Sequence, residues 1–118
     1  MDFEILREYC LHKPSAWESY PFGEGALVIK VLDKMFALIA ENSQPLRISL
    51  KCDPDDAMAL RTQYLAIIPG YHFNKKHWNT LILDGSLSSQ LVFELVDHSY
   101  QLVVAGMSKA KQRRLRDE

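Results

Sequence analysis

The sequence has little of what defines several classes of protein. Its 118 residues include two cysteines, five glycines and five prolines. Two cysteines cannot form a disulfide scaffold or, alone, a metal cluster, and so few glycines and prolines are not typical of a disordered or low-complexity chain. The longest apolar run, Met35 to Ala40, is too short to span a membrane. Charged residues interrupt the first fifteen positions, so we expect no signal peptide.

An excess of charge of either sign is also missing. Fourteen basic residues face fifteen acidic ones, which gives a formal net charge of -1. This balance argues against a protein that coats nucleic acid nonspecifically, because such binding rests on many phosphate contacts, but it is compatible with a local basic patch. The hydrophobic fraction, 47%, is ordinary. We therefore expect residues 1–118 to form a single domain in a reducing, cytoplasmic compartment.

Hydrophobic periodicity predicts a helix and three strands in the first half of the chain. Apolar residues recur at helical spacing over Phe3 to Leu11. Strands are predicted over residues 27–31, 35–40 and 46–51, joined by turns. In the third strand, apolar and polar side chains alternate: Leu46, Ile48 and Leu50 with Arg47, Ser49 and Lys51. Because successive side chains of a strand point to opposite faces, one face of this strand is apolar and the other polar.

The second half is predicted to contain two helices and one strand. Asp53-Pro54 is a typical helix start, because Asp53 can cap the helix and Pro54 suits its first turn. This helix runs to about Tyr64, a strand covers about 78–83, and serines 86, 88 and 89 offer caps for a long final helix. The order of elements predicts an α+β fold, an antiparallel sheet packed against helices, with Arg47, Ser49 and Lys51 on its exposed face.

From about residue 109 the chain becomes a basic tail. Five cations lie within eight positions: Lys109, Lys111, Arg113, Arg114 and Arg116. Such a cluster can bind phosphates. We favour the simpler interpretation that the tail is a solvated helix end, where cations complement the helix dipole.

The densest polar and aromatic functionality lies between Pro69 and Thr80. These twelve residues include three aromatics, two histidines, two lysines and two asparagines. Aromatic rings offer stacking surfaces for bases, lysines neutralise phosphates, and amides pair with base edges. The segment is therefore typical of a nucleic-acid contact loop. The alternative is structural: Tyr71, Phe73 and Trp78 pin the loop to the core while its lysines are solvated.

Signals for catalysis and for metal binding are weak. His72 and His77 lack the spacing of zinc ligands, and the sequence has no nucleophile elbow, Walker A loop or dinucleotide fingerprint. Cys52 lies next to Lys51 and before a helix start, a position that can lower a thiol pKa. We expect no enzyme activity, no metal and no cofactor. A weaker alternative is an enzyme in which His77 acts as a general base oriented by Asp84.

The same residues resemble a known family. The run from Pro69 to Thr80, with its Asn-Lys-x-His-Trp core, and the following Leu83-Asp84-Gly85 and Ser99-Tyr100 are similar to the bacterial MmcQ/YjbR family. Earlier matches are Tyr9-Cys10, Pro14, Pro21-Phe22-Gly23, Lys30-Val31 and Lys34-Met35-Phe36-Ala37. The resemblance covers about residues 2 to 107 and excludes the basic tail. It implies a frataxin-like α+β fold and, by analogy with a double-wing arrangement, DNA binding.

Together these observations predict a non-enzymatic DNA-binding protein that uses the basic and aromatic loop and the exposed face of the sheet. The expected DNA contacts are Arg47, Lys51, Tyr71, His72, Asn74, Lys75, Lys76, His77 and Trp78. The alternative is a small-molecule or protein-binding module in which the same loop forms a pocket wall. We expect no membrane association, and the sequence is compatible with a monomer without defining the oligomeric state.

Overall fold

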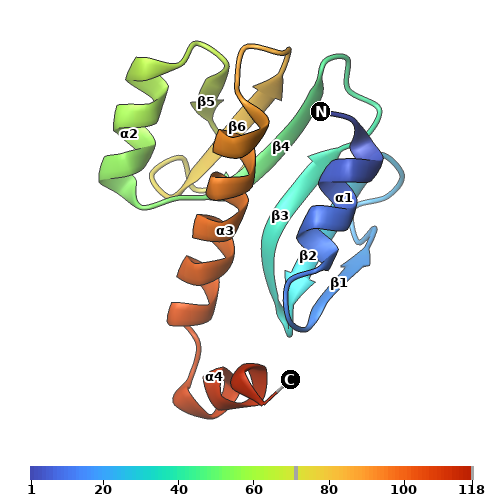
Figure 1. Cartoon of the computed structure of the whole chain (residues 1–118), viewed down its shortest axis with the longest axis vertical. Helices are drawn as coiled ribbons and strands as arrows, with labels where there is room; N and C mark the ends of the chain where they lie inside the picture. The colour runs from blue at the N-terminus through green and yellow to red at the C-terminus, as the bar shows by residue number, and fades with distance from the viewer. Residues whose placement is uncertain (71, 118) are drawn as a thin grey trace.

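The computed structural model describes residues 1–70 and 72–117. The helices of this part of the chain are α1 (Phe3–Leu11), α2 (Pro54–Gln63), α3 (Ser89–Ala105) and α4 (Lys109–Arg116). Its strands are β1 (Ala16–Ser19), β2 (Ala26–Val31), β3 (Lys34–Ala40), β4 (Leu46–Lys51), β5 (Ile67–Pro69) and β6 (Trp78–Leu83). Figure 1 shows their arrangement.

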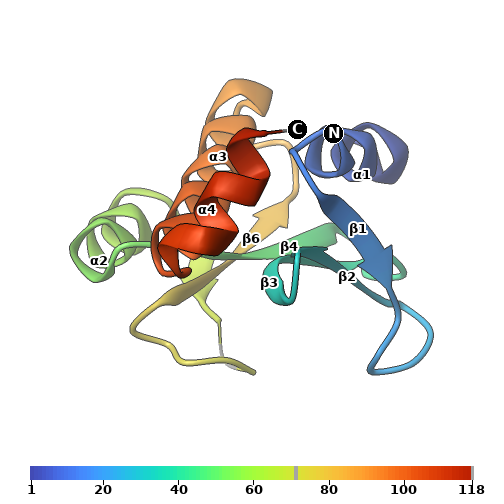
Figure 2. The ribbon, with the colours of Figure 1, turned by 90° about the horizontal axis from the view of Figure 1, so that it is seen from below.

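All six strands join one antiparallel sheet in the order β1-β2-β3-β4-β6-β5. Turned by 90°, the molecule shows α1 and α3 together on one side of this sheet (Figure 2). The predicted α+β fold, an antiparallel sheet packed against helices, is thus confirmed. Within the described ranges, no helix combines the length and the hydropathy that a membrane span requires.

The helices and strands predicted from periodicity are present, and three further elements were not foreseen. Strands β1 and β5 are four and three residues long and form the two edges of the sheet. The basic tail is a separate helix, α4, capped by Ser108. Its Leu115 is buried against the core, and the ammonium group of Lys111 pairs with the Asp33 carboxylate at 3.1 Å.

The core lies between the sheet and the helices. One row of direct cross-strand neighbours consists of Leu27, Ile39, Ile48, Leu81 and Ile67, and all five are buried. Leu6 and Cys10 of α1 and Val92 and Val96 of α3 belong to the same hydrophobic cluster. Because these helix positions recur every three or four residues, each helix buries one stripe.

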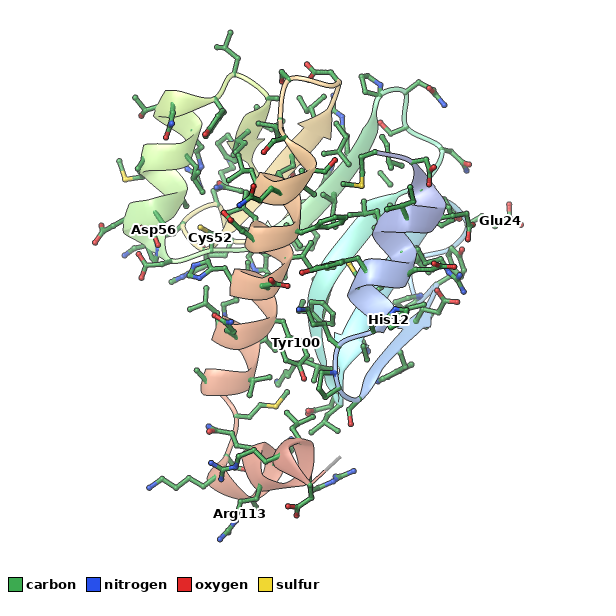
Figure 3. All side chains as sticks on the ribbon, in the orientation of Figure 1. His12, Glu24, Cys52, Asp56, Tyr100 and Arg113 are labelled. Carbon is green, nitrogen blue, oxygen red and sulfur yellow. The ribbon has the colours of Figure 1, made fainter. Side chains whose placement is uncertain are left out.

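A buried serine ties α3 to the sheet. The Ser99 hydroxyl donates to the Phe36 carbonyl of β3 at 2.6 Å and accepts from the Lys51 amide of β4 at 2.9 Å. Tyr100, labelled in Figure 3, meets the Phe36 ring edge-on with the centroids 5.3 Å apart. Since both hydrogen-bond partners of Ser99 are backbone groups, α3 is held at one position over the central strands.

The cap of α2 is the one that the sequence predicts. Asp53 Oδ1 accepts from the backbone amides of Asp55 and Asp56 at 3.0 and 3.4 Å, and Pro54 occupies the first turn. We expect Asp53→Ala to lower the free energy of unfolding by about 0.5–2 kcal/mol in urea denaturation, because two amides lose their acceptor. Asp53→Asn, which keeps the acceptor, should cost less. Loss of ligand binding at unchanged stability would contradict a purely capping role.

Candidate nucleic-acid interface

The face of the sheet opposite the helices is open, and two loops border it. Figure 2 shows the loop between β1 and β2 (residues 20–25) and the loop between β5 and β6 extending away from the helices. A groove of about 530 Å³ lies between them, which we call the open-face groove. Phe22 lines it from the first loop, His72 and Phe73 line it from the second, and strand side chains form its floor.

The alternation of the strands builds this floor. One row of cross-strand neighbours on the open face consists of Val28, Leu38, Ser49, Thr80 and Ile68. The hydroxyl groups of Ser49 and Thr80 hydrogen-bond to each other at 2.8 Å. In the next row, Arg47 stands beside the small side chain of Ala40. The floor therefore combines apolar side chains with two hydroxyl groups and one guanidinium.

Arg61 of α2 anchors the loop between β5 and β6. Its Nε donates to Asn79 Oδ1 at 2.6 Å, and its Nη2 donates to the carbonyl oxygens of Lys75 and, at 3.4 Å, of Trp78. Asn79 is buried and in turn donates to the Ala57 carbonyl of α2 at 3.4 Å. Because a guanidinium presents its donors in a rigid fork, one side chain fixes both the loop and the start of β6.

Contacts within this loop define its shape. Asn74 Oδ1 accepts from the Lys76 amide at 3.0 Å. Gly70 allows the chain to pass close to β6, since a Cβ at this position would lie 2.9 Å from Trp78 Cβ. The rings of Phe73 and Trp78 stack with their centroids 4.9 Å apart and their planes at 24°. Trp78 thus supports the Phe73 ring, which lines the groove.

Charge is distributed unevenly between the two sides of the sheet. The six strands contain one carboxylate, Glu18, and it faces α1, where hydrogen bonds from Arg7 lower its pKa. Cations on the open face and its second loop are Lys30, Arg47, Lys51, Lys75 and Lys76. The helices and their caps carry both signs of charge: their acidic residues include Asp2, Glu4, Glu8, Asp53, Asp55, Asp56, Glu94 and Asp97, and their cations include Arg7, Arg61, Lys109, Lys111, Arg113, Arg114 and Arg116. On the open-face strands and the second loop, by contrast, no carboxylate offsets the cations. The open face is therefore the more basic one.

Two carboxylates lie close to the strand ends that border the open face. Glu24 precedes β2, and Glu41 follows β3 and accepts a hydrogen bond from the Tyr20 hydroxyl at 3.1 Å. By contrast, among the described residues no hydrogen bond or ion pair uses the guanidinium of Arg47. Its charge is available to an anion that enters the groove.

The structure places most of the predicted contacts on this side of the molecule. Arg47 and His72 line the groove, and Lys51 is the direct cross-strand neighbour of Trp78. Lys75 and Lys76 are exposed in the second loop. Lys51, Lys75 and Lys76 do not line the groove, so they surround it and do not form its walls.

The remaining predicted contacts have different surroundings. The Asn74 carboxamide oxygen is used inside the loop, and the His77 carbonyl accepts from the Cys52 amide at 2.8 Å, which joins the loop to the end of β4. Both residues therefore help to hold the loop in place. Tyr71 lies outside the described residues.

Two interpretations of reactive groups are wrong. Burial, together with the nearby carboxylates of Asp56 and Asp53, raises the pKa of the Cys52 thiol to about 11, so this thiol is not activated; Figure 3 shows Cys52 and Asp56 near the start of α2. His77 directly precedes β6 and Asp84 directly follows it. A six-residue strand separates them by roughly 20 Å, so Asp84 does not orient His77.

The structure also shows functional residues that sequence reasoning missed. Phe22 enters the sequence analysis only as part of the Pro21-Phe22-Gly23 match, yet it is 70% exposed and lines the groove. Arg61 lies within the helix predicted to begin at Asp53, where the sequence indicates no role for it, yet it anchors the second loop. The Pro-Phe-Gly context marks a turn but does not indicate which way its aromatic ring points, and nothing in the sequence links Arg61 to Asn79.

Fold and site together define an α+β domain with an open sheet face that two loops border. The chain matches the family model YjbR over residues 11–102 and belongs to this family. The resemblance inferred from the Asn-Lys-x-His-Trp segment is thus confirmed.

Individual relatives extend the match over almost the whole chain. The uncharacterised protein YjbR of Escherichia coli is 39% identical over 115 residues, which cover 98% of this chain and 98% of that protein. A crystal structure from Deinococcus radiodurans has 42% identity and a TM-score of 0.90, covering 97% of this chain and 87% of that one. A crystal structure from Pseudomonas syringae has 29% identity and a TM-score of 0.74, covering 86% and 98%.

Proposed function

We propose that this protein binds DNA through the open face of its sheet and catalyses no reaction. The observation that carries the proposal is the uneven distribution of charge. Cations occupy the open face and the second loop, while the strands contribute no carboxylate to that face. Since phosphate contacts supply most of the affinity for DNA, a basic face on a chain of net charge -1 concentrates binding on one side.

Each part of the face has a role in this proposal. Lys75 and Lys76 neutralise phosphates at the second loop, and Lys51 does so along β4. Arg47 places a cation at the groove between the loops. The two loops project from opposite sides of the groove, so they straddle the bound strand and position it. Asn74, whose carboxamide oxygen is bound within the loop, acts through the shape of the loop.

The salt dependence of binding tests this function. We expect Lys75→Ala/Lys76→Ala to flatten the plot of log affinity against log salt, by about 0.9 per lost contact for duplex DNA and about 0.7 for a single strand, because fewer counterions are released. The measurement is fluorescence anisotropy of a labelled oligonucleotide, single-stranded and duplex, at several salt concentrations. The loss should be similar for different sequences, since phosphate contacts carry no sequence information.

A matched control removes the same charge from the opposite side. Arg113 and Arg114 are exposed on α4, and Figure 3 shows Arg113 at the end of the molecule that α4 forms. Arg113→Ala/Arg114→Ala should leave the salt slope unchanged. Equal effects of the two pairs, or no binding of either DNA form by the unmodified protein at about 50 mM salt, would overturn the proposal.

A second candidate function is binding of a small molecule in the open-face groove. Its volume of about 530 Å³ falls within the range of about 300–1,000 Å³ that is typical of ligand sites, and its lining is largely apolar with few polar groups. This candidate predicts binding that depends on Arg47 but not on Lys75 or Lys76. Lys75→Ala/Lys76→Ala therefore separates it from DNA binding, since only DNA binding should weaken in that variant.

A further inference from the structure

We infer that the open-face groove holds an unstacked nucleobase, so that the preferred ligand is single-stranded and not duplex DNA. This inference rests on the proposed function and names the form of nucleic acid that the site takes. The observations that carry it are the concave shape of the face, the aromatic side chains on both of its walls, and the polar groups on its floor.

Shape is the first argument. A duplex presents its phosphates on a convex surface and keeps the faces of its bases stacked inside. A convex duplex surface cannot enter a groove of about 530 Å³ that lies between two projecting loops. A base that has left the stack can enter it. Enzymes that act on bases use this arrangement, at a cost that is smallest when the strand is already single.

The walls supply aromatic surfaces on both sides. Phe22 on the first loop is 70% exposed, although a phenyl ring gains free energy when it is buried. On the second loop, the Phe73 ring stacks on Trp78 with the centroids 4.9 Å apart. Trp78 therefore fixes the orientation of the ring that lines the groove. Base stacking on aromatic side chains is worth about 1–3 kcal/mol per base and is largely independent of sequence.

The floor supplies polar groups for the sugar, phosphate and base edges. Arg47 offers a guanidinium that no described residue uses. The hydroxyl groups of Ser49 and Thr80 share one hydrogen bond, in which one donates and the other accepts. The accepting hydroxyl keeps its own proton, which it can donate to a ligand. Because these groups are few and the other floor side chains are apolar, the groove favours a flat, largely apolar ring attached to an anion.

The test compares three labelled probes of equal length: a mixed-sequence single strand, its duplex, and an abasic strand that keeps the phosphates but lacks the bases. We expect the single strand to bind at least about tenfold more tightly than either of the others. Phe22→Ala should weaken binding of the single strand by roughly 5- to 150-fold, which is the equivalent of one lost stack, and should leave the salt slope unchanged, because it removes no charge. Because Phe22 is exposed, this substitution leaves the core intact.

Leu65→Ala is the matched control, since Leu65 is 99% exposed and does not line the groove; it should not change binding. Equal affinity for the single strand and the duplex, or for the single strand and the abasic strand, would overturn the inference while leaving DNA binding in place. Binding of a mononucleotide as tight as that of the strand would overturn it in favour of a small-molecule site. Failure of every DNA probe to bind would remove the proposed function itself.

Discussion

Leu81→Ala should lower the free energy of unfolding by about 2–5 kcal/mol. Leu81 is 1% exposed in β6, directly between Ile48 of β4 and Ile67 of β5. Removing its side chain takes away buried apolar surface and leaves a cavity that the strands on either side cannot close, because their hydrogen-bonded register fixes their spacing. A loss of this size is a large fraction of the stability of a small domain.

The measurement is chemical denaturation followed by tryptophan fluorescence, with Leu65→Ala as the reference. The same atoms are removed in both variants, but Leu65 is 99% exposed, so its substitution should change stability by no more than about 0.5 kcal/mol. Equal midpoints for the two variants would show that Leu81 does not contribute to the core as the cross-strand register requires.

The comparison of Leu81 with Leu65 illustrates which parts of the fold the sequence predicts. In β4, apolar and polar residues alternate, so the strand, its buried face and the open-face positions of Arg47 and Lys51 follow from periodicity alone. Strands β1 and β5 are too short for a period to be counted, and β5 ends in a proline. They exist because neighbouring strands offer them backbone partners, which is a tertiary effect.

The candidate site, too, is predicted only in part from the sequence. The residues of the second loop were identified because cations and aromatics are concentrated there. The groove was not, since it needs Phe22, two loops far apart in sequence and the small side chains of β2 and β3 to meet on one face. The roles of Asn74 and Cys52 depend on which atoms surround them: a carboxamide bound within its own loop, and a buried thiol beside carboxylates.

Arg61 gives the second large expected effect, because it joins the fold to the proposed binding face. In Arg61→Ala, the buried side-chain carboxamide oxygen of Asn79 loses its donor, which costs about 1–3 kcal/mol. The loop carrying Lys75 and Lys76 also loses its hydrogen bonds to Arg61 of α2. A loop that must be ordered on binding weakens affinity. We therefore expect DNA binding to weaken about tenfold, or about 1.4 kcal/mol, although Arg61 itself is a positioning residue.

Arg61→Lys separates the effect of the positive charge at this position from the effect of the hydrogen bonds that anchor the loop. Lysine keeps the positive charge but lacks the fork that reaches Asn79 and the loop carbonyls together, so it should restore little of the lost affinity. Hydrogen exchange provides the structural readout: the His77 amide, which donates to the Asn74 carbonyl at 3.0 Å inside the loop, should exchange faster in both variants, while amides of β3 should be affected only through global stability. If lysine restores full binding, Arg61 acts through its charge. If the loop amides remain protected while binding is lost, the guanidinium contacts DNA itself.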